Sequence, residues 1–346
     1  MRRPDSLPPG SACHADAMTT ALPPGCRSHV VDAAGHRAHC VEAGEGPLVL
    51  LVHGYPESWY SWRHQLPALA AAGYHPVAID VRGYGRSSKP LPVEDYRMVR
   101  LVADNVALVA ALGHETATIV GHDWGAPIAW TSAMLRPDVF TAVAGLSVPF
   151  SPPGEVRPLA AMRLMAGDEE FYIEYFQEPG RAEAEIEADV RGWLRGFMFS
   201  ASGDAPLPDP TVGTIATVRR GGLMKARFHQ PEVLPAWLTE DDVDVYTAEF
   251  QHSGFRGPLN RYRNVDRDWE DLAAFRGASI RVPSLFIGGD RDGPTLWGAP
   301  AIAAFDRTLP GLRGSIILEG CGHWTQQERP AEVNAALVEF LAGLPR

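Results

Sequence analysis

The sequence has no apolar run that approaches the roughly 20 residues of a membrane-spanning helix, so we expect no membrane span. It has only four cysteines and no C-x-x-C pair, which favours free thiols in a reducing cytoplasm over a disulfide framework. No cluster of His, Cys and carboxylate residues has the spacing of metal ligands, and we therefore expect no metal site. Positive charge is also scarce, and the formal net charge is −11. This net charge argues against nucleic acid or an anionic membrane as the main partner.

Material for a hydrophobic core is plentiful. Apolar residues make up 45% of the 346 residues and charged residues 21%, which is typical of a globular protein with one large domain or a domain with an insertion. Residues 1–27 differ, because they are rich in proline and small polar residues and lack the apolar region of a signal peptide. We expect residues 1–27 to be disordered.

Short apolar segments alternate along the chain with segments whose apolar residues recur every three or four positions. The first kind predicts buried strands and the second predicts helices, which end here at Gly or Pro. This alternation predicts an α/β fold with a mostly parallel central sheet and helices on both of its faces. The predicted strands are residues 46–54, 74–83, 117–122, 141–148, 280–290 and 314–320, and the predicted helices are residues 62–73, 98–113, 126–137 and 330–343.

The alternation stops at about residue 151 and returns at about residue 267. The intervening stretch opens with SPPGE and is rich in helical and loop signals, with few strand signals. We therefore predict a core of residues 28–150 and 267–346 that is interrupted by a helical insertion, residues 151–266.

The stretch TATIVGHDWGAPIAW, residues 116–130, has the form of a sharp turn between a buried strand and a helix. Asp123 occupies the position at which such a turn exposes its side chain, and Gly121 and Gly125 flank it. The backbone N–H of Trp124 lies at the start of the helix and is free to donate. A helix N-cap is the alternative interpretation of this aspartate, and the turn alone does not decide between the two.

Other loops supply groups that could act with Asp123. His323 follows the last predicted strand, and Asp290 and Asp292 follow the strand before it. Tyr55 lies in LVHGYPES, just after the first strong strand, and offers a second backbone N–H. Because the carboxyl ends of parallel strands meet at one crevice, we expect these groups to lie close together.

An aspartate nucleophile favours one kind of chemistry. Its carboxylate is ionised at neutral pH without help from a base, so it can attack a saturated carbon and form an ester. His323, oriented by Asp292 or Asp290, could then activate water against that ester. The N–H groups of Tyr55 and Trp124 would stabilise the resulting oxyanion.

Six segments together resemble the soluble epoxide hydrolases of the α/β-hydrolase fold, and the resemblance runs from about residue 28 to the end of the chain. The segments are HGYPESWYSWR, DVRGYGRSSKP, GHDWG, FYIEYFQEPGRAEAE, GFRGPLNRYRN and GCGHWTQQERP. The resemblance implies a helical cap domain on the core and the conversion of epoxides to vicinal diols without a cofactor.

The resemblance also assigns roles to individual residues. It implies that Asp123 is the nucleophile, His323 the general base and Asp292 its charge partner. Tyr172 and Tyr262, both in the insertion, match the tyrosines that hold and protonate the epoxide oxygen, although Tyr175 lies on nearly the same helical face as Tyr172. We also expect the side chains of Trp124, Tyr55 and Phe171 to contact substrate, and the resemblance makes a homodimer through the cap plausible.

Two other functions stay open at this level. A haloalkane or haloacid dehalogenase would use the same aspartate ester, but a halide leaves without a proton, so two tyrosine donors and the absence of Asn after His-Gly favour an epoxide. A hydrolase-fold protein that binds a small ligand without turnover is the second alternative. A binder has no need of His323 and Asp292, which favours the enzyme.

Overall fold

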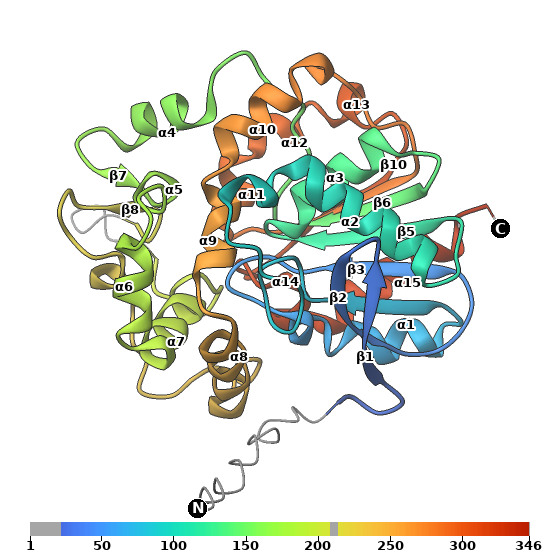
Figure 1. The fold of residues 1–346 in the computed structure, drawn as a ribbon, viewed down its shortest axis with the longest axis horizontal. Helices are drawn as coiled ribbons and strands as arrows, with labels where there is room; N and C mark the ends of the chain where they lie inside the picture. The colour runs from blue at the N-terminus through green and yellow to red at the C-terminus, as the bar shows by residue number, and fades with distance from the viewer. Residues whose placement is uncertain (1–21, 208–213, 346) are drawn as a thin grey trace, which may run out of the picture.

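The computed structural model describes residues 22–207 and 214–345. Its centre is an eight-stranded sheet in the order β1-β2-β4-β3-β5-β6-β9-β10 (Figure 1). Only β2 runs opposite to the other strands, because its pairings with β1 and β4 are both antiparallel. The strands are β1 (Arg27–Ala33), β2 (His36–Glu42), β3 (Leu48–Val52), β4 (His75–Ile79), β5 (Ala117–His122), β6 (Phe140–Leu146), β9 (Ser284–Gly289) and β10 (Leu312–Leu318).

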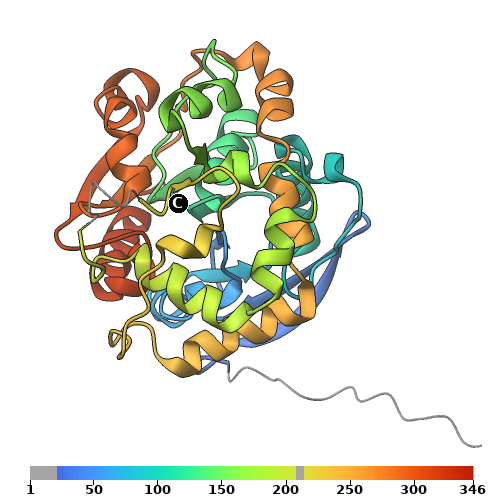
Figure 2. The ribbon, with the colours of Figure 1, turned by 90° about the vertical axis from the view of Figure 1, so that its left-hand side faces the viewer.

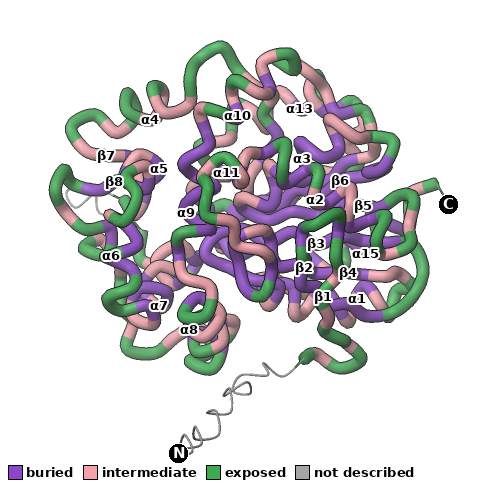
Figure 3. Tube along the Cα trace, viewed as in Figure 1, coloured by how far each residue is buried: buried purple, intermediate pink, exposed green. Residues whose placement is uncertain are grey.

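Side chains alternate between the two faces of the sheet and build two cores. In β3, Leu48, Leu50 and Val52 pack into one core with residues of α2 (Met98–Ala111) and α3 (Gly125–Leu135). Val49 and Leu51 face the other core with residues of α1 (Gln65–Ala71) and α15 (Pro330–Ala342). Central strands buried on both faces need apolar residues at every position, which is why they form unbroken apolar runs in the sequence. Figure 3 shows the buried sheet inside a partly exposed layer of helices.

The α/β-hydrolase fold is confirmed, and all six predicted strands and four predicted helices are present. The hairpin of β1 and β2 was not predicted, because its residues alternate in exposure or are polar and give no continuous apolar run. The remaining core helices are short: η1 (Trp59–Trp62), η2 (Val93–Tyr96), η4 (Ala273–Phe275), α11 (Gly293–Trp297), α12 (Ala299–Ile302), α13 (Phe305–Thr308) and α14 (Thr325–Glu328).

The segment between β6 and β9 forms a separate helical lobe beside the sheet (Figure 1), and we call residues 151–266 the cap. The exact limits of the cap stay a prediction, and residue 266 falls inside α10. Most of the expected disordered stretch, residues 1–21, lies outside the described residues. The lobe contains α4 (Pro158–Ala166), β7 (Glu170–Phe171), α5 (Tyr172–Tyr175), α6 (Arg181–Glu187), α7 (Val190–Ser200), β8 (Thr217–Val218), η3 (Met224–Arg227), α8 (Glu240–Ser253), α9 (Arg256–Tyr262) and α10 (Val265–Asp271).

Polar contacts fix the cap to the core. Thr239 and Asp242 form a capping box at the start of α8, and the same Asp242 accepts a hydrogen bond from the Tyr60 hydroxyl at 2.9 Å. Arg63 forms an ion pair with Asp242 at 3.2 Å. On α8, the Tyr246 hydroxyl donates to Gln327 of the core at 3.0 Å. The start of α8 is therefore held both by its own cap and by the core, which keeps the lobe in place over the loops that follow the strands.

Candidate active site

A cavity of about 450 Å³ lies between the cap and the loops at the carboxyl ends of the strands. That volume is in the range of small-molecule sites. Asp123 lines this cavity, and the rest of its lining comes from the segments after β5, β6 and β9 and from α4, β7 and α5. The lining includes Asp123, Trp124, Val148, Met162, Phe171, Tyr172 and Trp297.

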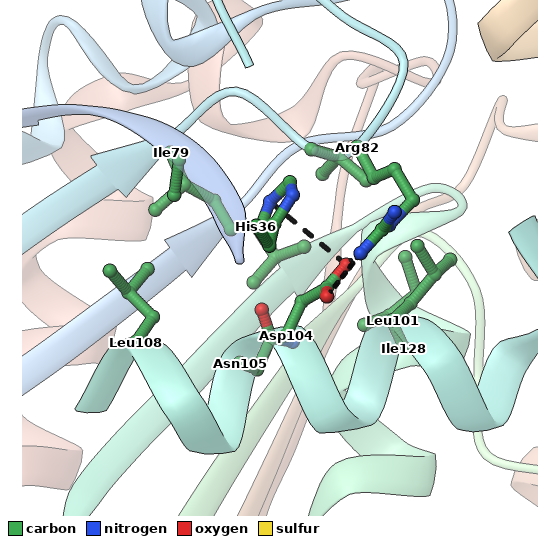
Figure 4. Close-up of a pocket in the computed structure, with 11 residues that line it drawn as sticks. His36, Ile79, Arg82, Leu101, Asp104, Asn105, Leu108 and Ile128 are labelled. Atoms are coloured by element: carbon green, nitrogen blue, oxygen red, sulfur yellow. Dashed lines mark hydrogen bonds and ion pairs between the residues drawn. The ribbon is translucent and has the colours of Figure 1, made fainter. Parts of the chain in front are cut away.

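A second cavity lies apart from this region, between β2, β4 and α2 (Figure 4). Its volume is about 10 Å³, which leaves room for about one water molecule. The charged groups there already pair with each other, because Arg82 donates two hydrogen bonds to Asp104 at 2.7 and 2.6 Å. This cavity is too small for an organic substrate, and the larger one is the candidate active site.

Asp123 is presented by a strained turn. Its backbone has φ of 49°, a left-handed conformation that non-glycine residues rarely adopt. A side chain at Gly121 would meet the carbonyl oxygen of Gly125 at 2.0 Å, so the tight path of the chain requires glycine. The result is a carboxylate that lines the cavity, with Oδ1 accepting a hydrogen bond from the Tyr55 N–H at 2.8 Å.

His323 lies between two carboxylates. Its Nε2 is 3.4 Å from Asp123 Oδ2, and its Nδ1 is 2.9 Å from Asp292 Oδ1. The structure also distinguishes the two candidate partners, because Asp290 is exposed and accepts from the Gly320 N–H instead. Asp123, His323 and Asp292 thus form a continuous chain of contacts, and Asp290 is outside it.

The electrostatics suit a nucleophile and a base. Burial raises the pKa of Asp123, but the hydrogen bond and the charge of His323 outweigh burial and hold that pKa below its ordinary value. Burial lowers the pKa of His323, but Asp292 and Asp123 outweigh it and raise that pKa well above its ordinary value. The carboxylate of Asp123 is therefore ionised across the neutral range, and the imidazole binds a proton strongly while both carboxylates are charged.

Two cap tyrosines lie near the nucleophile. Tyr172 lines the cavity, and the Tyr262 ring lies 5.9 Å from the Tyr172 ring and 5.1 Å from Trp124, measured between ring centroids. Burial and the charge of Asp123 raise the pKa of both phenols, which keeps them protonated. Tyr175 is different, because its hydroxyl donates to Glu185 within the cap. The geometry therefore favours Tyr172 over Tyr175.

The three residues predicted to contact substrate, Trp124, Phe171 and Tyr55, do not all line the cavity. Trp124 and Phe171 line the cavity, as expected. The backbone N–H of Trp124 has no hydrogen bond to Asp123 in the described part of the chain. The ring of Tyr55 does not line this cavity but packs against cap aromatics, and only 2% of that residue is exposed. Its backbone N–H, and not its side chain, reaches the nucleophile.

Sequence reasoning missed Ser147, which directly follows β6. Its hydroxyl donates to Asp292 Oδ2 at 2.7 Å and lies 3.0 Å from His323 Nδ1. With φ of 69° its backbone is left-handed, so the chain turns sharply as the strand ends. The predicted strand, residues 141–148, placed Ser147 within the sheet and so concealed it. Its hydroxyl holds Oδ2 of Asp292, and Oδ1 of the same carboxylate then faces the imidazole of His323.

A buried network behind the imidazole was also missed. His122 donates from Nε2 to the carbonyl oxygen of His323 at 2.7 Å, and its Nδ1 is 2.7 Å from Glu57 Oε2. Glu57 is fully buried and also accepts from the Gly54 N–H at 2.9 Å and from Gln326 at 3.0 Å. The motif HGYPES contains Glu57, but the motif alone does not show that Glu57 contacts His122 and that His122 contacts the loop of His323. These segments are far apart in the chain and come together only in the fold. The network ties the loop of the base to the loop of Tyr55.

The described residues contain neither a cluster of metal ligands nor a membrane-spanning helix. Within residues 22–207 and 214–345, no group of three or more His, Cys, Asp or Glu side chains is placed to hold a metal ion. Among the helices of that same part, none is both long and apolar enough to cross a bilayer. The cysteines there, Cys26, Cys40 and Cys321, are free thiols, and Cys13 lies outside it.

Comparison with known proteins identifies what the chain is similar to. A family model described as the alpha/beta hydrolase fold matches residues 47–330. Epoxide hydrolase B of Mycobacterium tuberculosis is 45% identical over 91% of this chain and 98% of that protein. Epoxide hydrolase A of the same organism is 46% identical over 91% of this chain and 97% of its own length.

A solved structure agrees with these relatives. The epoxide hydrolase from an endophytic Streptomyces is 62% identical, with a TM-score of 0.90, and the match covers 92% of this chain and 96% of that one. These similarities support the epoxide interpretation and not the dehalogenase or the ligand binder.

Proposed function

The chain belongs to the epoxide hydrolases of the α/β-hydrolase fold, and on that premise we propose that it converts epoxides to vicinal diols through a transient ester on Asp123. One observation carries the proposal: the Asp123 carboxylate reaches the cavity between the Tyr55 N–H and the His323 imidazole. The test is an assay of diol formation from styrene oxide. Release of halide from a haloalkane without any diol from an epoxide would favour the dehalogenase instead.

In the first half-reaction Asp123 attacks one carbon of the epoxide. A carboxylate oxygen forms a bond to that carbon, the carbon–oxygen bond of the ring breaks, and its electron pair stays on the ring oxygen. That oxygen must then be protonated or strongly hydrogen-bonded, and Tyr172 and Tyr262 are neutral phenols that can do so. The product is a hydroxyalkyl ester of Asp123.

The charge of Asp123 links the two half-reactions. While it is ionised, it adds to the effect of burial in raising the pKa of Tyr172 and Tyr262, and it adds to the effect of Asp292 in raising the pKa of His323. Ester formation removes this charge. The phenols therefore become stronger acids as the alkoxide forms, and His323 gives up its proton more readily when a base is next required.

In the second half-reaction His323 takes a proton from water, and the water oxygen attacks the ester carbonyl. The oxyanion that forms accepts hydrogen bonds from backbone donors, of which Tyr55 already contacts Asp123 Oδ1 and Trp124 is the second candidate. The intermediate collapses as its bond to the substrate oxygen breaks, and that oxygen takes the second proton of the water, which leaves the diol and the free carboxylate. The imidazolium proton restores the phenol, so the net reaction is epoxide plus water to diol.

Replacing Tyr172 or Tyr262 with phenylalanine is expected to slow ester formation by about 100-fold, because each change removes one donor to the developing alkoxide. Replacing both is expected to slow it further. Hydrolysis of an ester already formed does not use these hydroxyls, so the ester is not expected to accumulate. Stopped-flow measurement of the two half-reactions separates the effects.

Tyr175→Phe is the matched control for these variants. Tyr175 lies in the same short helix as Tyr172, but its hydroxyl donates to Glu185 away from the cavity. We expect ester formation in Tyr175→Phe to stay within about twofold of wild type. A loss in Tyr175→Phe as large as in Tyr172→Phe would contradict the assignment.

Acidic pH is expected to increase the steady-state fraction of ester. After the ester forms, Asp292 still faces the imidazole and raises the pKa of His323, so the imidazole becomes protonated and hydrolysis slows as pH falls. The lowered pKa of Asp123 keeps its carboxylate ionised at about pH 5, so attack continues. Acid quenching and intact-protein mass spectrometry at about pH 5 and pH 8 measure the fraction. An equal or smaller fraction at the lower pH would contradict this division of roles.

The expected oligomeric state and the expected location in the cell also stay proposals. A homodimer through the cap rests on the resemblance alone. A cytoplasmic location is consistent with the scarcity of cysteine and with the free thiols of the described residues.

A further inference from the structure

The loop that carries His323 is bound to the cap by hydrogen bonds. His323 lies in the segment 320–324, which follows β10, and its backbone N–H donates to the carbonyl oxygen of Ala201 at 2.9 Å. Ala201 directly follows α7 of the cap, the lobe that faces the viewer in Figure 2. From the same segment, the indole N–H of Trp324 donates to the carbonyl oxygen of Met198 in α7 at 2.7 Å. The proposed base is therefore held by the cap as well as by the core.

Two glycines let the cap and this loop approach each other with no side chain between them. A Cβ atom on Gly203 would lie 2.3 Å from the carbonyl oxygen of Gly320 and 2.8 Å from the nitrogen of Gly322. A Cβ atom on Gly322 would lie 2.2 Å from the nitrogen of Gly203. These distances are far below ordinary van der Waals contact, so a side chain at either glycine would push the two segments apart.

The carboxylate of Glu328 joins the same two segments. Its Oε2 accepts from the N–H of Gly203 at 2.9 Å and from that of Gly322 at 2.8 Å, and its Oε1 accepts from the N–H of Trp324 at 3.0 Å. Only 7% of Glu328 is exposed, so these donors take the place of water around the carboxylate. Burial raises the pKa of Glu328, and the three N–H donors oppose that rise. Because Gly322 and Trp324 are the two neighbours of His323 in the chain, Glu328 holds the backbone on both sides of the base.

We propose that Glu328 is a positioning residue for the second half-reaction, and that it acts by holding the backbone around His323 against residues 201–203 of the cap. For hydrolysis, the imidazole must stay in contact with Asp292 on one side and within reach of the ester of Asp123 on the other. Contact between residues 201–203 and the loop then keeps the base in this place. The inference rests on the proposed function, since it assumes that His323 activates water against an ester.

Formation of the ester uses other contacts. Asp123 attacks from the turn after β5, and the phenols of Tyr172 and Tyr262 belong to α5 and α9. The hydrogen bonds that join residues 201–203 and Glu328 to the loop of the base do not involve any of these three side chains. A disturbance of this contact is therefore expected to slow hydrolysis of the ester more than its formation.

The first test changes only the cap. Gly203→Ala places a methyl group against the loop of His323, and a displacement of about 1 Å at a reacting group can cost about 100-fold in rate. We expect the rate constant for ester hydrolysis to fall at least about tenfold, and that for ester formation to stay within about threefold of wild type. Stopped-flow measurement of a single turnover of styrene oxide gives both constants. An equal fall in both constants, or no fall in hydrolysis, would overturn the proposal.

Gly154→Ala is the matched control within the cap. No atom of the described residues lies within 4 Å of a Cβ atom at Gly154, and its φ is not in the left-handed region. Both rate constants are expected to stay within about twofold of wild type. A loss of hydrolysis as large as that in Gly203→Ala would mean that any added methyl group in the cap has this effect, and the specific contact would be ruled out.

The second test changes the carboxylate and leaves the cap intact. Glu328→Gln replaces one acceptor oxygen with an NH₂ group that cannot accept, so at least one of the three N–H groups loses its partner. We expect ester hydrolysis to slow at least about fivefold, with ester formation again within about threefold of wild type. Glu332→Gln, at an exposed position of α15, is the control and is expected to match wild type within about twofold. Equal rates in the two variants would overturn the role of Glu328.

The pH dependence of ester hydrolysis separates displacement of the base from general damage. Contact with Asp292 raises the pKa of His323, so a loop that has moved away from Asp292 lowers that pKa again. In Gly203→Ala and Glu328→Gln, the midpoint of the pH dependence is therefore expected to shift to lower pH. A midpoint that stays at the wild-type value in both variants would contradict positioning by Glu328. Failure of the proposed function is distinct, because the wild-type enzyme would then form neither ester nor diol from styrene oxide.

Discussion

Replacing Asp123 with alanine or asparagine is expected to abolish epoxide hydrolysis, with kcat/KM falling by about four orders of magnitude or more. The reason is that, among the described residues that line the cavity, Asp123 is the only carboxylate that could form the ester. His323 and Asp292 remain in these variants, but they act on an ester that no longer forms. Measurement of diol production at high enzyme concentration gives the residual rate.

Asparagine serves as the control for shape. It keeps the size of the side chain and an oxygen that can accept the hydrogen bond from the Tyr55 N–H. A melting temperature close to that of wild type, together with the loss of activity, would assign the effect to the missing carboxylate. Activity above about one hundredth of wild type in both variants would show that water attacks the epoxide directly.

Replacing His323 with glutamine is expected to stop the reaction after one ester has formed on each chain. General-base catalysis contributes about 10²–10⁴ in rate, so turnover should fall by a factor of that size. Attack on the epoxide needs only the ionised Asp123 and the two tyrosines. Intact-protein mass spectrometry should therefore show the mass of one substrate added per chain, on the peptide that contains Asp123.

Asp290→Asn is the matched control for the base and its partner. Asp290 lies two positions before Asp292, but it is exposed and bonds to the Gly320 N–H, so its loss should leave ester hydrolysis close to wild type.

If the His323→Gln variant carried no adduct and also made no diol, His323 would be needed for attack, and the proposed order of steps would be wrong.

The central fold was predictable because buried parallel strands require apolar residues at each position. The strands β3, β5 and β9 are buried throughout, and each forms a clear apolar segment. The edge strand β1 alternates in exposure, and the neighbouring β2 is largely buried but carries the polar residues His36, His39 and Glu42, so neither strand has a continuous apolar run. A continuous apolar segment in the sequence therefore identifies a strand that is buried on both faces more readily than a strand that exposes one face or carries polar residues.

The residues of the site were predictable only in part. Asp123, His323 and Asp292 each follow a recognisable strand, so topology alone brings them together. Ser147 also follows a strand, but its hydroxyl matters only because the chain turns with positive φ at that residue, which no spacing reveals. The choice of Tyr172 over Tyr175 rested on the resemblance, since the two lie on nearly the same helical face, and in the structure Tyr172 lines the cavity whereas Tyr175 bonds to Glu185.

The shape of the pocket was beyond the reach of the sequence. Phe171 was predicted to contact substrate, but whether an aromatic ring of the cap lines a cavity or is buried depends on packing among segments far apart in the chain. Phe171 lines the cavity, whereas Phe176 and Trp193 are buried and do not line it. Only the exposed surface of each ring separates the two cases.

Isotope transfer to the nucleophile tests the central claim most directly. The wild-type enzyme is given excess styrene oxide in ¹⁸O-water, digested, and the peptide containing Asp123 is analysed by mass spectrometry. Because water attacks the ester carbonyl, ¹⁸O is predicted in the side chain of Asp123, while the diol released in the first turnover carries an unlabelled oxygen from the enzyme. An unlabelled Asp123 in enzyme that has turned over many times would contradict the ester mechanism.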